Sequence, residues 1–207
     1  MCLWIQLPGM LLVCGSQFVR AFETLEGMSL SLLLLIAAYT LLHLSLAWRA
    51  DREKKNSETA NNKRVYFAWL LGVGFVLFAV LKNSYQWSEH DTVTMALAFT
   101  GTIAIFGTGS AWGLPLSDAR LQSMLAMVFK AIPQFILAWK IYEVGGAGMP
   151  GLAILAGNLT IIGRIIRVHN SLKSSESISE RWLLRSEWAN ELSWLAVSVV
   201  WLKWFIF

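Results

Sequence analysis

Apolar residues in this chain gather in long blocks that are separated by short polar segments. A helix that crosses a bilayer needs about 20 mainly apolar residues, and seven blocks approach that length. They span residues 3–20, 28–48, 65–82, 92–112, 121–142, 149–168 and 187–207. Because lipid offers the backbone no hydrogen-bond partner, each block is expected to be helical. The pattern predicts an all-α polytopic membrane protein with about seven transmembrane helices; whether residues 3–20 span is left open, since Gln6, Pro8 and Gln17 dilute them.

Composition agrees with this pattern. Of the 207 residues, 56% are hydrophobic and 14% are charged, whereas soluble domains carry about 25% charged residues. The net charge of +4 arises from 17 Lys and Arg against 13 Asp and Glu, and much of the positive charge falls in two short hydrophilic segments. We interpret this basicity as a signal of membrane topology, and expect membrane lipid but no nucleic acid as a partner.

The two basic segments indicate an orientation. Residues 49–64 carry six Lys or Arg residues and residues 169–186 carry three. Such residues are enriched in cytoplasmic loops, and the four helices between the two segments return the chain to the same side. The N-terminus is then cytoplasmic and the C-terminus lies on the other side. Short loops without a large soluble domain suit a bacterial inner (plasma) membrane.

Polar landmarks recur in the two halves in the same order. The pairs are Gln17 with Gln134, Gly27 with Gly148, and Trp69 with Trp194. This order predicts two repeats of three helices, residues 1–82 and 121–207, joined by a linker helix within 83–120. Three crossings reverse the chain, so one extra helix lets both repeats insert in the same orientation. Glycines in the linker helix, at 101, 107 and 109, permit close approach of a neighbouring helix.

The second half carries a recognisable motif. Pro133-Gln134 inside a helix, followed by a short loop and by Gly148-Met149-Pro150 at the start of the next helix, resembles the PQ-loop superfamily, which includes the SWEET sugar transporters and lysosomal amino-acid exporters. The first half keeps Gln17 and Gly27 but has Ser16 in place of the family's proline. The resemblance implies two three-helix bundles that alternate access to a central site. The hinge positions that it implies are Pro133, Pro150, Gly148 and Gly27.

Polar and aromatic side chains within the expected helices are the candidates for substrate binding. They are Asn158, Gln134, Gln17, Trp69 and Trp194. A side-chain amide deep in a membrane helix is expected to face the bundle interior, where Asn158 either binds substrate or bonds to another helix. The two tryptophans either stack on a flat metabolite or anchor the membrane interface. Pro133 removes a helix hydrogen bond at a cost of about 3 kcal/mol, so it is either a hinge or a static kink.

Other polar residues receive structural interpretations. His43, one turn from Tyr39 on the same helix face, either relays protons or simply packs. Asn190 is expected near the membrane interface, Arg164 at the cytoplasmic edge, and Glu89-His90-Asp91 on a solvated surface. No Asp or Glu is expected deep enough in a span to couple transport to protons.

Motifs of zinc proteases, serine hydrolases and P-loop proteins are absent from the sequence. We therefore expect no enzymatic activity, no cofactor and no bound metal. The main hypothesis is a carrier that moves a small polar metabolite, sugar or amino-acid-like, by alternating access. The alternative is a non-transporting scaffold, sensor, or immunity or exclusion subunit that acts through a protein partner. A homo-oligomer is compatible with both, and an intramembrane enzyme that uses His43 is a third hypothesis.

Overall fold

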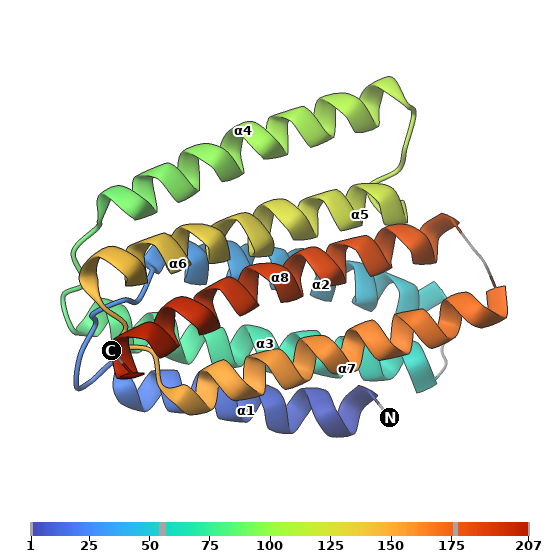
Figure 1. The fold of residues 1–207 in the computed structure, drawn as a ribbon. Coiled ribbons are helices and arrows are strands. Elements are labelled where there is room, and N and C mark those ends of the chain that lie inside the picture. Colours follow the sequence, from blue (N-terminus) through green and yellow to red (C-terminus); the bar gives the residue numbers. More distant parts are fainter. Residues whose placement is uncertain (1, 54–56, 176–177, 207) are drawn as a thin grey trace.

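The computed structural model describes residues 2–53, 57–175 and 178–206, and the regular structure in these ranges is entirely helical (Figure 1). The elements are α1 (Cys2–Arg20), α2 (Leu30–Glu53), α3 (Ser57–Lys82), α4 (Glu89–Ala111), α5 (Ala119–Ala126), η1 (Met127–Ala131), α6 (Ile132–Val144), α7 (Gly151–Ser175) and α8 (Ile178–Ile206). Because α5, η1 and α6 follow one another without a break, the described ranges form seven helices. The all-α prediction is confirmed, while Lys54, Lys55 and Phe207 lie outside the described residues.

Five of these helices are long and apolar enough to cross a membrane, which indicates an integral membrane protein. They are α2, the Thr59–Lys82 part of α3, α4, the continuous helix Ala119–Val144, and α7 as far as Asn170. The predicted spans 3–20 and 187–207 correspond to α1 and α8, which are helical but are not among these five. In α8 charge explains the difference, because Glu187, Glu191 and Lys203 lie within its apolar stretch.

The helices extend further into the basic segments than the hydropathy pattern predicts. Helix α2 continues to Glu53 and α3 begins at Ser57, so most of the segment 49–64 is helical. Ion pairs support this extension: Arg49 Nε lies 3.5 Å from Glu53 Oε1 one turn later, and Lys63 pairs with Asp51 across the junction. A loss of apolar residues therefore marks the end of a membrane span rather than the end of a helix.

Connections gather at two opposite ends of the molecule (Figure 1). The N-terminus, the α2–α3 and α7–α8 junctions and the α4–α5 connection lie at what we call the basic end. The connections 21–29, 83–88 and 145–150 lie at the other end, which we call the glycine-loop end, together with the C-terminus. Both basic segments therefore occupy the same end, as the even number of intervening helices predicts.

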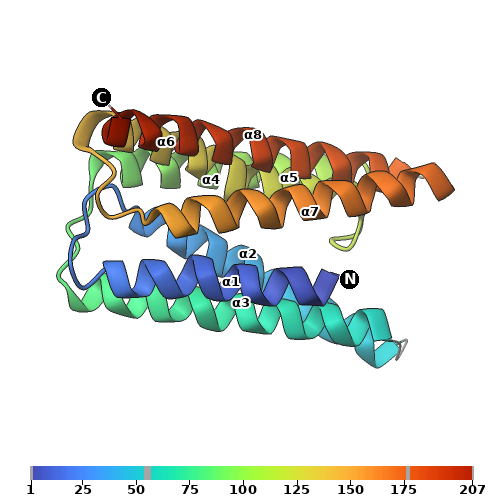
Figure 2. The ribbon, with the colours of Figure 1, turned by 60° about the horizontal axis from the view of Figure 1, so that its bottom comes forward.

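Packing follows the same order in the two halves. Helix α3 packs against both α1 and α2, and α8 packs against both α6 and α7. Across the middle of the molecule, α1 packs against α7 and α2 packs against α6 and η1. Figure 2 shows α1 and α3 on one side and α8 with α6 on the other. The principal apolar clusters mirror this division, one centred on α3 and another on α8.

Helix α4 lies at the outer face of the molecule, against the Ala119–Val144 helix and α2 (Figure 1). Two of its glycines make the close approach that the sequence predicts. A Cβ at Gly101 would lie 3.0 Å from Val128, and one at Gly109 would lie 2.8 Å from Leu121. Gly107 has open space around it, so it contributes nothing to this contact.

Pro133 stands directly after a wide helical turn. Residues Met127–Ala131 form a π-helix, and the N–H of Ile132 donates to the carbonyl of Met127, five residues earlier. Since proline cannot donate a backbone hydrogen bond, the helix changes register just before it. The Pro133 side chain is fully buried. A π-turn of this kind is frequent at functional sites, and here it carries Lys130.

Candidate functional site

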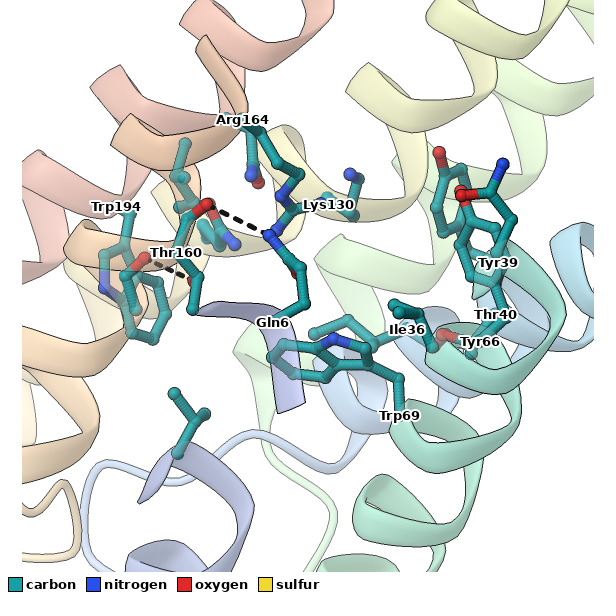
Figure 3. A pocket seen from close by; sticks show the side chains of 17 residues that line it. Gln6, Ile36, Tyr39, Thr40, Tyr66, Trp69, Lys130, Thr160, Arg164 and Trp194 are labelled. Carbon is teal, nitrogen blue, oxygen red and sulfur yellow. Dashed lines mark hydrogen bonds between the residues drawn. The ribbon is translucent and has the colours of Figure 1, made fainter. Parts of the chain in front are cut away.

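A cavity of ≈ 170 Å³ lies between the two halves, towards the basic end. Its wall receives residues from α1, α2, α3, the Ala119–Val144 helix, α7 and α8, but none from α4 among the described residues. Such a pocket, enclosed by apolar and aromatic side chains with a few polar groups, is typical of a small-molecule site. Figure 3 shows the aromatic and polar side chains that surround it.

The two tryptophans that the repeat aligned both line this cavity. Trp194 is buried, and its indole N–H donates to the carbonyl of Ile154 at 3.2 Å. Its ring packs directly over Gly157, where an added Cβ would lie 2.3 Å from the indole nitrogen. Trp69 is half-buried on α3. Tyr39 and Tyr66 add two further rings to the wall, so four aromatic side chains contact the cavity.

Amide side chains form the neutral polar part of the wall. Gln134, a predicted site residue, accepts a hydrogen bond from Ser193 at 2.6 Å through Oε1 and is thereby fixed against α8. Gln6 donates to the carbonyl of Thr160 at 3.3 Å, which joins α1 to α7. Asn190 is 2% exposed and also lines the cavity. Asn190 faces the bundle interior, and its expected depth at the membrane interface stays a prediction.

Two cations complete the wall, and sequence reasoning missed both as site residues. Lys130 projects from the π-turn, and its Nζ lies 4.7 Å from the centre of the Tyr39 ring. Arg164 lines the cavity from α7, with Nε 3.8 Å from Glu187 Oε2. That Arg164 reaches the cytoplasmic edge stays a prediction; the structure adds that it lines the cavity. A lysine in the middle of an apolar span is itself a signal of function, and that rule would have identified Lys130.

Two acids that the sequence did not single out are buried within the bundle. Glu187 and Glu191 on α8 are 7% and 3% exposed. They escaped notice because they precede the most apolar part of the last helix. Neither is among the described residues that line the cavity.

A second, smaller cavity of ≈ 60 Å³ lies further towards the glycine-loop end. Gln17, another predicted site residue, lines it and donates to Met149 Sδ at 3.6 Å. Four residues line both cavities, which therefore meet at one layer of the interface. They are Val13, Ile36, Trp69 and Trp194. The two predicted tryptophans thus stand between the cavities.

Beyond the second cavity, the predicted hinge glycines bring two connections into backbone contact. The N–H of Gly148 donates to the carbonyl of Glu26 at 2.7 Å, and a Cβ at Gly148 would lie 2.3 Å from that oxygen. Gly27 has a φ of +74°, and a Cβ there would lie 2.5 Å from the carbonyl of Gly145. Pro150 directly precedes α7, and its carbonyl accepts from Ala153 at 2.9 Å. Hinge positions 27, 148 and 150 therefore lie at a closed end rather than inside a helix.

A buried carboxylate fastens the same end. Asp91 is 0% exposed and accepts hydrogen bonds from Ser31 Oγ at 2.7 Å, Tyr85 at 2.6 Å and Ser88 Oγ at 2.7 Å. Lys140 on α6 donates to the Tyr85 hydroxyl at 2.6 Å. Burial, followed by the adjacent Asp91, raises the pKa of the Tyr85 phenol. The network ties α2, α4 and α6 together.

The interpretation of Glu89-His90-Asp91 as solvated surface was therefore wrong for two of its residues. Asp91 and His90 are buried in the first turn of α4, and His90 Nε2 lies 2.9 Å from Glu143 Oε2. Glu89 alone is exposed. Asp91 is drawn inward because it caps the helix: the Ser88 side chain accepts from its N–H while its carboxylate accepts from the N–H of Ser88.

Asn158 and His43 stay outside both cavities. Asn158 Nδ2 donates to Ser198 Oγ and to the carbonyl of Ile154, each at 2.9 Å, and so joins α7 to α8. His43 lies between two rings, 4.1 Å from the centre of Tyr39 and 5.1 Å from that of Tyr66. The structure therefore brings together Trp69, Trp194 and Gln134, places Gln17 in the second cavity, and leaves Asn158 apart.

Comparison of the chain with protein-family models, with curated proteins and with solved structures finds no match.

Proposed function

We propose that this protein is an integral membrane carrier that moves a small metabolite by alternating access between two three-helix bundles. The bundles are α1–α3 and the set formed by the Ala119–Val144 helix, α7 and α8, with α4 as the linker. In each set the third helix packs against the other two. Between the sets, the first helix of one packs against the second helix of the other in both directions, as the α1–α7 and α2–α6 contacts show. This is expected of parallel repeats related by an axis along the membrane normal.

The observation that carries the proposal is the position of the two cavities. Both lie on the interface between the bundles, in line from the basic end to the glycine-loop end, and share Trp69 and Trp194. A scaffold has no need of cavities on its internal interface, whereas a carrier needs a site there that opens to one side at a time. Kinship with the PQ-loop superfamily is part of this proposal and rests on Pro133-Gln134 and Gly148-Met149-Pro150.

In the present state, the larger cavity lies towards the basic end and the other end is closed. The closure consists of the Gly148–Glu26 backbone contact and the Asp91 network with Lys140. With the basic end in the cytoplasm, this is an inward-facing arrangement. Export or uptake then requires the closed end to separate while the bundles approach each other at the basic end.

The two halves are not expected to bend equally. The second half has the π-turn and Pro133 in its first helix. At the corresponding place in α1, Ser16 donates its hydroxyl to the carbonyl of Leu12, one turn earlier, within a regular helix. We therefore propose that the Ala119–Val144 helix bends during transport and that α1 stays straight.

Counterflow in liposomes that contain the purified protein tests the proposal. Vesicles loaded with one unlabelled sugar, amino acid, nucleoside or monocarboxylate should take up the labelled form of the transported compound. A variant with Trp69→Ala and Trp194→Ala should lose this uptake, and the exposed Trp112→Ala should retain it. Absence of uptake across all four classes, together with co-purification of a stoichiometric protein, would instead establish the scaffold alternative.

A further inference from the structure

We infer that the larger cavity binds a small monocarboxylate with a flat, apolar body. The inference names the substrate class of the proposed carrier and rests on that proposal for its role in transport. The binding of a carboxylate is argued separately, from the charge, shape and size of the cavity, and it can be tested without measuring transport.

The charge of the wall has one sign. Among the described residues that line the cavity are two cations, Lys130 and Arg164, and no Asp or Glu. Glu187, which pairs with Arg164, and Glu191 are buried on α8 and do not line the cavity. A ligand inside the cavity therefore meets the cations first. A charge of the opposite sign on the ligand is therefore favoured.

Lys130 is the residue that we assign to the ligand's carboxylate. Its side chain is 8% exposed, and no carboxylate of the described residues lies within 4 Å of its Nζ. Its Nζ faces the Tyr39 ring at 4.7 Å, and the charge of buried Glu187, which is paired with Arg164, acts on it from beyond direct contact. A buried ammonium is costly unless it is paired, and a bound carboxylate would supply the missing partner. Arg164, held by Glu187, adds positive charge to the same wall.

The remaining wall selects the body of the ligand. Trp69, Trp194, Tyr39 and Tyr66 present aromatic surface (Figure 3), which suits a planar apolar group. The volume of ≈ 170 Å³ is close to the roughly 150 Å³ cavity that holds benzene in an engineered protein. Because no acid of the described wall can receive an ammonium group, an amino-acid zwitterion fits less well than a plain carboxylate.

Binding to the purified, delipidated protein in detergent tests this inference, with intrinsic tryptophan fluorescence as the readout. The probes are three pairs of equal size, acetate and acetamide, propionate and propionamide, and benzoate and benzamide, with inorganic phosphate as a further anion. We expect benzoate to bind more tightly than benzamide by about tenfold or more, the difference typical of a charge-assisted hydrogen bond. Equal affinities within all three pairs, or tighter binding of phosphate than of any carboxylate, would overturn the inference.

Variants of Lys130 then locate the contact. Lys130→Met keeps the length and removes the charge, so it should abolish the preference for benzoate over benzamide, and Lys130→Arg should restore it. Lys203→Met, which removes an exposed lysine at the glycine-loop end, should leave the preference unchanged. Thermal melting shows which variants are folded. A preference that persists in folded Lys130→Met protein would contradict the assignment.

The two proposals fail in different ways. If benzoate binds with the expected dependence on Lys130 but no compound is transported in liposomes, the carboxylate site is supported and the proposed carrier function is rejected. If a neutral compound is transported and no preference for anions is found, the carrier function is supported and the carboxylate inference is rejected.

Discussion

At the scale of single residues, Trp194 and Gly157 set the width of the cavity. The indole ring can lie this close to α7 only because position 157 has no side chain. The hydrogen bond from the indole N–H to Ile154 then fixes the ring in that place. A small residue on one helix and a large one on the next thus form a rigid part of the wall, which is how close-packed interiors hold aromatic groups in position.

Replacement of this glycine should be harmful even though alanine is the better helix former. In Gly157→Ala the new Cβ would stand 2.3 Å from Trp194 Nε1, so the ring must move, and overpacking of this kind costs about 1–3 kcal/mol. We expect a lower melting temperature and a changed tryptophan emission spectrum. Gly107→Ala on α4, where nothing lies within 4 Å, should melt at or above the temperature of the native protein. Equal behaviour of the two variants would show that Trp194 is not held in this way.

The candidate site could be predicted from the sequence only in part, and the division has a physical cause. Trp69 and Trp194 were identifiable because the predicted repeat aligns them, and both line the cavity. Gln6, Lys130 and Arg164 have no such counterpart, and their roles depend on which helices meet across the middle of the molecule. Charged residues near a span boundary are ambiguous, because the same side chain can extend to water or turn into the bundle.

At the scale of elements, the closed end depends on two short connections rather than on helix packing. Residues 21–29 and 145–150 meet through backbone atoms, and a buried carboxylate with its hydroxyl and lysine partners lies beside them. Native Cys14 lines the second cavity just inside this closure and is 5% exposed. It therefore offers a chemical probe of whether the end opens.

Gly148→Ala should open this end. The added Cβ would lie 2.3 Å from the Glu26 carbonyl oxygen, a backbone atom that cannot turn away, so the connections must separate. With Cys2→Ser in the background, we expect Cys14 to react about tenfold faster with a water-soluble maleimide, which corresponds to about 1.4 kcal/mol of destabilised closure. Gly74→Ala, where nothing lies within 4 Å, should leave the rate unchanged. An unchanged rate in folded Gly148→Ala protein would show that the glycine contact is not the closure.

The boundaries of the elements show a second limit of sequence reasoning. Hydropathy located the apolar part of the helices, but it missed the continuation of α2 and α3 into the basic segment, where one i,i+4 charge pair and one ion pair between the helices support them. The π-turn before Pro133 was predicted only as a kink or hinge. The exact backbone geometry of the π-turn depends on which neighbouring groups donate hydrogen bonds to the freed carbonyl groups. The sequence of this helix alone does not determine those neighbours.

At the scale of the whole molecule, charge and packing give the same account of topology. The three connections at the glycine-loop end, 21–29, 83–88 and 145–150, contain no Lys or Arg, whereas both basic segments lie at the other end (Figure 1). The number of apolar blocks and the charge pattern were sufficient to predict the ends. They could not predict that α1 packs against α7, because the hydrophobic pattern of a helix does not identify the distant helix that it contacts.

The outstanding question at this scale is whether α1 crosses the membrane, and Cys2 can answer it. If α1 spans, Cys2 lies on the cytoplasmic side with the basic segments; if it does not, the N-terminus stays on the side of residues 21–29. We expect Cys2, in a Cys14→Ala background, to react with a membrane-impermeant maleimide only after cells are lysed. Ser117→Cys in the α4–α5 connection should behave alike, while Ser84→Cys at the glycine-loop end should react in intact cells. Reaction of Cys2 in intact cells would remove α1 from the bilayer. The first bundle would then lack a membrane-spanning helix, so the two halves could not rock as equivalent units.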